Sequence, residues 1–302
     1  MLVRFELISL AFFLALAAAP GCDKTPPPEG TAGTASTQAA LAPVSEGPIR
    51  VSGSSALQPL VNAAKEKFEA QNKGASVEVS AGGSKKGLVD VASGAVQIGD
   101  SDIFAAPDQT SLVDHKVAVV GFAAMANKGP YNAKITSLGM DQIAKIFTGD
   151  IKNWKDLGGG SQPIVVINRA PASGTRTVFG NVVLGGDKFV ESQTEDNSGA
   201  LVAKLKQTQG AISYLALSFK DDDLLTLSIK IGPDTMDPTA ETITQGKYPV
   251  WSYEHMYTKG EATGGAKRFL DFVLSPDFQA TTLPSVKGFI PITAMKVQRE
   301  KD

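Results

Sequence analysis

The stretch PIVVINRAPASGTRTVF (163–179) contains a strand, a turn and the start of a helix in one short run. Four consecutive apolar residues, Ile164 to Ile167, predict a buried strand. The small residues of PASG (171–174) then predict a turn, and Ser173 stands where a helix N-cap is favoured. A buried strand that passes through a tight turn into a helix is typical of α/β proteins.

The same unit recurs nearer the N-terminus. IRVSG (49–53) predicts a strand, and the following segment (54–74) places Leu57, Leu60, Val61, Ala64 and Phe68 on one helical face. A second strand, SVEVSAGGS (76–84), enters a glycine-rich turn before a short helix (85–93), and AVQIGDSD (95–102) predicts a third strand. This order predicts an α/β sheet.

Two long extended stretches divide the folded body. KVAVVGFAAMANKG (116–129) and KYPVWSYEHMYTKG (247–260) are long enough to leave one sheet and enter another. Between them lies a second series of strands and helices, and AKRFLDFVLSPDFQ (266–279) predicts a terminal helix. We therefore expect two α/β domains, with the second inserted into the first. The expected ranges are 48–122 with 253–302 for domain I and 123–252 for domain II.

The composition limits the classes of partner. Of 302 residues, 42% are apolar and 20% are charged, as in globular proteins of one or two domains. The formal net charge is only −2, whereas nucleic-acid binders concentrate lysine and arginine. We expect no nucleic-acid partner.

The N-terminal segment indicates export. Residues 1–21 carry Arg4 and an apolar run from Leu7 to Ala19, shorter than the roughly 20 residues that span a bilayer. APGC resembles a bacterial lipobox, so we expect Cys22, the only cysteine, to be lipidated; the alternative is a chance free thiol. Residues 22–47, rich in Pro, Gly, Thr and Ala, predict a flexible tether.

Few residues suggest catalysis. His115 and His255 lie far apart without a ligand-spaced partner, so we expect neither a metal site nor imidazole catalysis. No G-x-S-x-G motif occurs, and GGSKKGL (82–88) lacks the residue order of a nucleotide P-loop. We expect no catalytic residues and no cofactor.

Three segments instead predict an anion site. SGSSALQ (52–58), AGGSKKG (81–87) and PASGTRTVF (171–179) each join a strand to a helical pattern through a small-residue turn. The carboxyl ends of strands in α/β sheets are where ligands bind. An oxyanion there would meet Arg169 and helix-start amides, and the glycines at 53, 83 and 174 would let the backbone come close. Each serine has the alternative role of a structural helix cap.

Two carboxylates follow the strand in QIGDSD (97–102). We expect Asp100 to be a solvated or capping residue, because a carboxylate repels an anion unless a proton lies between them. Asp102 has two open interpretations: the same solvated or capping role, or an acceptor for a protonated anion.

In this order, the motifs resemble those of the phosphate-binding component of bacterial phosphate ABC transporters, a family of type II periplasmic binding proteins. The resemblance covers most of residues 48–290 and includes QIAKIFTGDIKNWKDL (142–157) and TQGAISYL (208–215). It implies two domains, each a mixed sheet flanked by helices, with the ligand cleft between them.

The resemblance also implies the site residues and the role. Asp102 would accept a hydrogen bond from protonated phosphate. Pro171 stands where some members carry an acidic partner for the arginine, and Ala172 replaces a common glycine. The implied protein is a monomeric, lipid-anchored phosphate receptor in the periplasm or at the cell surface, which delivers phosphate to permease subunits. The phosphate contacts implied are Ser54, Ser55, Ala56, Ser84, Asp102, Arg169, Ser173, Gly174 and Thr175.

Two alternatives stay open. The protein could bind another tetrahedral oxyanion or use phosphate binding for sensing or surface attachment. A different class is a serine-dependent phosphoesterase or acyl hydrolase that uses Ser84 or Ser173, although no base is evident beside either serine.

Overall fold

The computed structural model describes residues 47–300. The predicted signal peptide (1–21), the lipidation site Cys22 and the tether up to residue 46 lie outside the described residues. Within residues 47–300, none of the helices combines the length and the apolar character that crossing a membrane requires.

Strands and helices alternate along most of the described chain. The strands are β1 (Ile49–Gly53), β2 (Val77–Ala81), β3 (Ile98–Ser101), β4 (Leu112–Asn127), β5 (Ser137–Gly139), β6 (Val165–Arg169), β7 (Gln193–Glu195), β8 (Ala211–Ala216), β9 (Leu224–Thr226), β10 (Ser228–Ile231), β11 (Asp234–Met236), β12 (Trp251–Lys259) and β13 (Phe289–Ile290). The α-helices are α1 (Gln58–Gln71), α2 (Ser84–Ser93), α3 (Met140–Phe147), α4 (Gly174–Phe179), α5 (Ser198–Gln207), α6 (Ala240–Thr244) and α7 (Gly264–Val273). Short 3₁₀ or π turns are η1 (Trp154–Leu157), η2 (Gly180–Leu184), η3 (Leu217–Phe219), η4 (Phe278–Thr282), η5 (Leu283–Ser285) and η6 (Ile292–Ala294).

One mixed sheet runs through the molecule. Its strand order is β2-β1-β3-β12-β4-β8-β6-β7, with β13 and β9 also paired to β4. β1 is parallel to β2 and β3, and β6 is parallel to β7 and β8, whereas β12 is antiparallel to both of its neighbours. A smaller sheet has the order β11-β10-β5. The predicted α/β class is confirmed.

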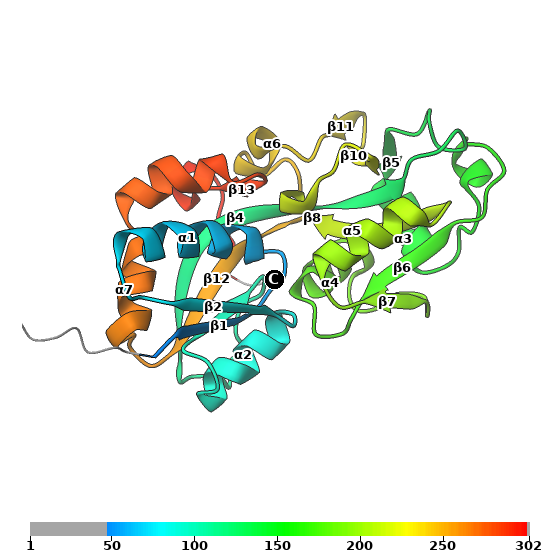
Figure 1. Cartoon of the computed structure of the whole chain (residues 1–302). Coiled ribbons are helices and arrows are strands. Elements are labelled where there is room, and N and C mark those ends of the chain that lie inside the picture. Colours follow the sequence, from blue (N-terminus) through cyan, green and yellow to red (C-terminus); the bar gives the residue numbers. More distant parts are fainter. Residues whose placement is uncertain (1–46, 301–302) are drawn as a thin grey trace, which may run out of the picture. The chain divides into compact units, whose positions relative to one another are not determined.

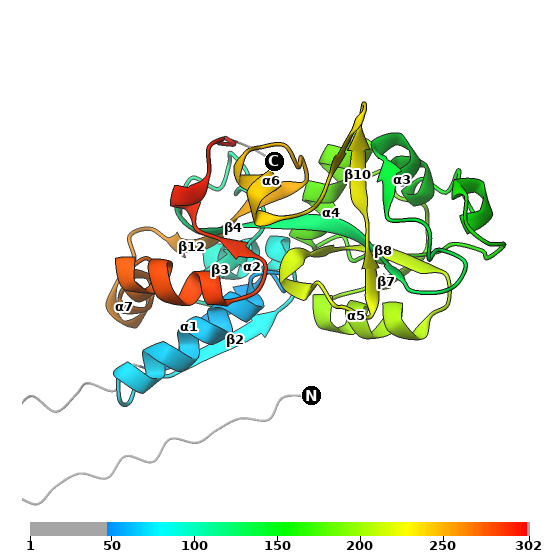
Figure 2. The ribbon, with the colours of Figure 1, turned by 90° about the horizontal axis from the view of Figure 1, so that it is seen from above.

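Strand β4 joins two halves of this fold. Its first part, to Gly121, pairs with β12 and β13, and its second part, from Phe122, pairs with β8 and β9. Figure 1 shows β1, β2, α1, α2 and α7 at one end of β4, which we call the first half, and β6, β7, α3, α4 and α5 at the other, the second half. The view from above in Figure 2 shows the same separation. The prediction that 116–129 passes from one sheet into another is confirmed.

The second crossing segment is shorter than predicted as a strand. β12 begins only at Trp251 and pairs with β3 and β4. Pro249, two residues before Trp251, has no N–H to donate to a ladder, and residues 247–250 are not part of a strand. The domain limits at 122/123 and 252/253 stay a prediction.

The first half has its core between the sheet and two helices. The predicted apolar face of α1 is confirmed, since Leu60, Val61, Ala64 and Phe68 are all buried. The ring of Phe68 meets that of Phe269 on α7 edge-on, with centroids 5.3 Å apart. α7 ends at Val273 rather than 279, because Ser275 precedes Pro276 and a residue before proline disfavours helical geometry.

An aromatic cluster forms the core of the second half. Phe179 of α4 stacks on Tyr214 of β8 with centroids 4.6 Å apart, and Phe147 of α3 packs edge-on against both rings. The buried Tyr214 hydroxyl accepts a hydrogen bond of 3.2 Å from the backbone N–H of Arg169. This core therefore anchors the end of β6, where the candidate site begins.

Candidate anion-binding site

Strand ends from both halves meet at one buried site. β1 ends at Gly53, β3 at Ser101 and β6 at Arg169, and each predicted segment follows one of these ends or starts a helix beside them. All nine predicted residues are brought together and buried, none with more than 3% of its surface exposed where a value is given. They are Ser54, Ser55, Ala56, Ser84, Asp102, Arg169, Ser173, Gly174 and Thr175.

Two glycines permit these segments to approach one another closely. A Cβ at Gly174 would lie 2.2 Å from the Ser84 hydroxyl, and one at Gly83 would lie 2.6 Å from the carbonyl oxygen of Ala172. Gly83 also has φ +87°, a conformation that other residues rarely adopt. The backbone N–H of Lys85 donates to Ala172 O at 3.1 Å, which bonds the start of α2 to the turn before α4.

Ser54 closes the turn between β1 and α1. Its hydroxyl oxygen accepts from the N–H groups of Ala56 at 3.0 Å and Leu57 at 3.2 Å, and its own O–H donates to Asp102 Oδ1. The serine thus has a capping role and a contact with Asp102 at once. Helix α1 itself begins only at Gln58.

Asp102 lies at the centre of the site. Besides Ser54, it accepts a hydrogen bond of 2.8 Å from Thr175 Oγ1 at its Oδ2 atom, and its backbone N–H donates to Ser84 Oγ at 2.9 Å. It is 1% exposed, so the interpretation as a solvated loop carboxylate is wrong. Ser84 is the first residue of α2 and its hydroxyl does not cap that helix.

Arg169 is a buried cation. It is 1% exposed and its Nη2 donates to Ser55 Oγ at 3.0 Å, while Nε and Nη1 have no acceptor among the described residues. Burial lowers the pKa of Arg169, an effect that the negative charge of Asp102 opposes. Arginine starts from so high a value that the guanidinium stays charged. Two donor nitrogens, Nε and Nη1, therefore have no acceptor among the described residues.

Ser173 caps the start of α4, which is the structural role that its position in the sequence suggested. Its side chain accepts from the backbone N–H of Arg176 at 3.2 Å, at the start of α4. Arg176 in turn donates from Nη1 to the carbonyl oxygen of Arg169 at 2.9 Å and pairs with Asp187 at 2.7 Å. These bonds hold the turn between β6 and α4 in place.

The expectation for Asp100 was wrong. It is 1% exposed and faces the interior, and its Oδ1 has no hydrogen-bond partner among the described residues. Burial, and next the charge of Asp102, raise the pKa of Asp100 well above its ordinary value. The sequence could not reveal this, because the parallel pairing of β3 with β1 decides that this end of the strand is covered.

Sequence reasoning missed Ser198. This fully buried residue begins α5, and its hydroxyl and backbone N–H lie 3.1 Å and 3.2 Å from Ser55 Oγ. The signal was present, because EDNSGALV (195–202) also joins a strand end to a helix through small polar residues. Ser55 is thereby held between α5 and Arg169.

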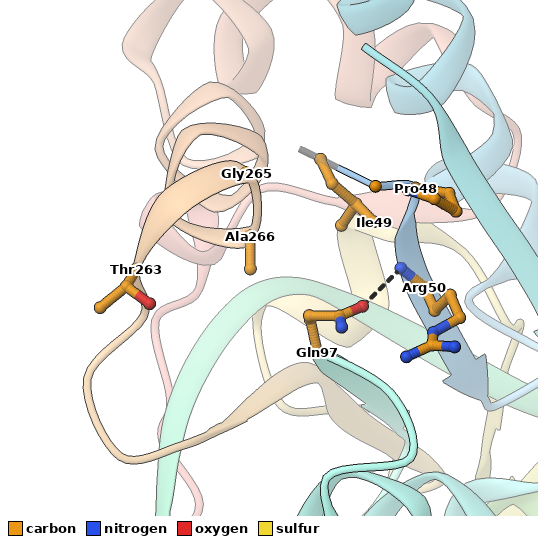
Figure 3. A pocket seen from close by; sticks show the side chains of 8 residues that line it. Pro48, Ile49, Arg50, Gln97, Thr263, Gly265 and Ala266 are labelled. Atoms are coloured by element: carbon orange, nitrogen blue, oxygen red, sulfur yellow. Dashed lines mark hydrogen bonds between the residues drawn. The ribbon is translucent and has the colours of Figure 1, made fainter. Parts of the chain in front are cut away.

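A separate surface pocket lies at the other end of β1 (Figure 3). It has a volume of about 400 Å³ and is bordered by Pro48, Ile49 and Arg50 at the start of the strand and by the first turn of α7. The backbone N–H of Arg50 donates to Gln97 Oε1 at 2.8 Å. None of the nine site residues borders this pocket.

Comparison with known proteins confirms the two-domain type II periplasmic binding fold that the sequence predicted. Residues 27–277 match a family model described as a PBP superfamily domain. The chain is 49% identical over 259 residues to the phosphate-binding protein PstS of Bacillus subtilis, covering 84% of each chain. PstS of Staphylococcus saprophyticus is 25% identical over 243 residues, which cover 76% of this chain and 75% of that protein.

Solved structures are similar as well. A Clostridium perfringens protein assigned as a phosphate ABC transporter substrate-binding protein, solved with bound phosphate, superposes with a TM-score of 0.74 at 28% identity. The match covers 82% of this chain and 100% of that one. An ABC-type phosphate transport receptor of Vibrio cholerae shares the fold, with a TM-score of 0.63 over 81% of this chain and 100% of that one at 21% identity. The chain therefore belongs to the PBP superfamily and, within it, to the PstS family of phosphate-binding proteins.

Proposed function

We propose that this protein binds inorganic phosphate outside the cytoplasm and delivers it to the permease of an ABC transporter for uptake. One observation carries the proposal: Arg169 is buried with two guanidinium nitrogens that no described residue accepts from, in a site that otherwise offers hydroxyls, backbone N–H groups and the single carboxylate of Asp102. Such a site suits a small, multiply charged oxyanion.

Different residues make different kinds of contact with the phosphate in this proposal. The Arg169 guanidinium supplies charge and forked donors. The hydroxyls of Ser55, Ser84 and Thr175, and N–H groups at the starts of α2 and α4, supply directional hydrogen bonds. Asp102 accepts from a phosphate O–H. The remaining proposed contacts come from Ser54, Ala56, Ser173 and Gly174.

The relatives support phosphate as the ligand and an ABC transporter as the partner. The Bacillus subtilis relative is named a phosphate-binding protein, and the Clostridium perfringens structure contains bound phosphate. An alignment that covers 84% of this 302-residue chain must include residues 54–175, where the predicted site lies, so the same ligand class is expected here.

A receptor without catalytic activity fits the site better than a hydrolase. A serine nucleophile needs an adjacent base. His255 instead lies 2.7 Å from Asp114 and His115 lies 3.0 Å from Thr258, so each imidazole is engaged away from Ser84 and Ser173. Ser84 accepts from the backbone N–H of Asp102, which leaves its O–H available to donate to an anion.

We also propose the remaining parts of the architecture. The protein is a monomer, anchored through lipid on Cys22 at the end of the 22–47 tether, in the periplasm or at the cell surface. Domain I comprises 48–122 and 253–302, and domain II comprises 123–252. The phosphate is held between them.

Oxyanion binding tests the function directly. The full chain, purified in mild detergent, is titrated with phosphate, arsenate and sulfate by isothermal calorimetry, and phosphatase and esterase substrates are assayed in parallel. Tight binding of phosphate and arsenate, weak binding of sulfate and no turnover are expected. If the protein does not bind phosphate, or if it hydrolyses the esters, it is not the proposed receptor.

A further inference from the structure

A second carboxyl group lies against the proposed phosphate acceptor. In β3 and β12, Ser101 pairs with His255 and Asp100 with Met256 in an antiparallel register. Asp102 is the first residue after β3, so one further step of this register would bring Glu254 opposite it. Side chains at directly opposite positions share a face of the sheet, with Cβ atoms roughly 5 Å apart. Figure 2 shows β3, β12 and β4 next to one another in the first half.

Glu254 is buried, and no N–H or O–H group of the described residues donates a hydrogen bond to it. It is 0% exposed, and both of its carboxyl oxygens lack a hydrogen-bond partner among the N–H and O–H groups of the described residues. An ionised carboxylate in such a place would be very unfavourable, whereas a neutral carboxylic acid carries an O–H that needs an acceptor. The acceptor at hand is the carboxylate of Asp102.

The surrounding charges agree with a neutral Glu254. Burial, and next the charge of Asp102 and a hydrogen bond with it, raise the pKa of Glu254 well above its ordinary value, and Asp100 adds to the shift. Within residues 47–300 no group of three or more His, Cys, Asp or Glu side chains is arranged to hold a metal ion.

The ionisable groups on neighbouring elements point elsewhere. Lys116 of β4 pairs in register with His255, on the opposite face from Glu254, and its Nζ lies 4.3 Å from the ring centre of Tyr253. His255 itself contacts Asp114. On the face of Glu254, β4 carries His115, which lies 3.0 Å from Thr258. Helix α2 packs against Gly99, on the opposite face of the sheet from Glu254. The ionisable residues of α2 are Lys85, Lys86 and Asp90.

We propose that Glu254, as a neutral carboxylic acid, donates a hydrogen bond to Asp102 and thereby orients the acceptor that recognises the phosphate proton. The inference rests on the proposed function. Glu254 would not touch phosphate and is a positioning residue. An ionised carboxylate can accept about four hydrogen bonds. Ser54 and Thr175 already supply two, so the O–H of Glu254 leaves room for about one phosphate hydroxyl.

Two substitutions separate this role from a purely structural one. Glu254→Gln keeps the shape and an N–H donor but cannot ionise, whereas Glu254→Met keeps the volume and loses the donor. At neutral pH we expect phosphate to bind the Gln variant within about 3-fold of wild type. The Met variant should bind on the order of 10- to 100-fold more weakly, the range for one hydrogen bond to a charged group.

The pH profile is the decisive measurement. At alkaline pH Glu254 ionises in the wild type and places a second negative charge beside Asp102, which weakens phosphate binding. The ratio of wild-type to Gln-variant dissociation constants should therefore rise from about 1 to at least ~10 as pH rises, corresponding to a repulsion of more than about 1.4 kcal/mol. Comparison at equal pH cancels the ionisation of phosphate itself. Asp100→Asn is the matched control, since it removes a neighbouring buried carboxyl and should keep the alkaline weakening.

The outcomes are distinct. A wild type that does not bind phosphate refutes the proposed function. A wild type that binds, with a Gln variant showing the same alkaline weakening, or with that weakening lost in Asp100→Asn instead, overturns the role of Glu254. If the Met variant does not fold, the pH dependence of phosphate binding by the Gln variant still tests the role of Glu254.

Discussion

Thr175 Oγ1 donates a hydrogen bond of 2.8 Å to Asp102 Oδ2, and so connects the start of α4 in the second half to the end of β3 in the first. Arg169 and Ser55 make a second bond of this kind, 3.0 Å from Nη2 to Oγ. The four residues of these two bonds join the two halves and are also among the residues that are proposed to bind phosphate. Ligand binding and closure of the halves should therefore be linked.

The first prediction concerns this closure. Without phosphate, these few polar contacts compete with water, so the halves should separate; phosphate bridges them and favours the closed form. Small-angle scattering should show a smaller radius of gyration at saturating phosphate. Arg169→Ala at the same phosphate concentration serves as the control and should stay expanded. Identical curves with and without phosphate would indicate a rigid site.

Replacing Arg169 with alanine should weaken phosphate binding by roughly 2–5 kcal/mol, the range for truncating one partner of a buried charge pair. The loss removes the only cation among the nine site residues. Arg50→Ala is the matched control: it removes the same charge at the opposite end of β1 and should leave affinity unchanged. Calorimetry of both variants gives the comparison, and equal affinities would place the anion elsewhere.

Asp102 should decide between phosphate and sulfate. Near neutral pH phosphate carries a proton that Asp102 can accept, whereas sulfate would face a bare carboxylate in a buried site. Sites that pair a specific ligand hydrogen reject an analogue without it by roughly 10⁴–10⁵-fold. Asp102→Asn should reduce that preference, because an amide can also donate. Competition calorimetry measures it, and an unchanged preference in the variant would contradict the role.

Cys22→Ser should release the protein from the membrane. Buried lipid chains contribute about 0.8 kcal/mol per methylene, and the tether composition offers no apolar face in their place. Incorporation of labelled fatty acid and fractionation of cells measure acylation and location together. Label incorporated equally into variant and wild type would exclude Cys22 as the anchor.

Stability should fall with pH because of Glu254. Unfolded Glu254 loses its proton near the ordinary pKa of 4.5, whereas the folded protein keeps it to well above that value. Between these two values the folded state binds more protons, so one such group lowers the free energy of unfolding by up to about 1.4 kcal/mol per pH unit. Glu254→Gln should remove this slope and gain stability over wild type as pH rises. Urea denaturation at several pH values measures the free energy of unfolding of both proteins. If this free energy changes with pH in the same way in wild type and variant, Glu254 ionises normally.

The local pattern of the sequence was sufficient to predict many of the elements. Apolar periodicity predicted β1, β4 and the buried face of α1, because a strand or helix must bury one side whatever its partners are. The small-residue turns predicted that Ser55, Ser84 and Arg169 would gather, since strand ends in such sheets share an edge. The family resemblance then supplied the assignment of these residues to phosphate.

Long-range pairing decided what the sequence could not. Asp100 and Glu254 are buried because β3 pairs with β1 and β12, partners that are distant in the chain, and no local pattern records that pairing. Ser198 reaches Ser55 across 143 positions for the same reason. A charge in a strand can face water or the interior, and only the register and the covering layers settle which. The sequence therefore determined which elements form and which side chains could bind an anion, whereas the tertiary structure decided which carboxyl groups lose their water and must share a proton.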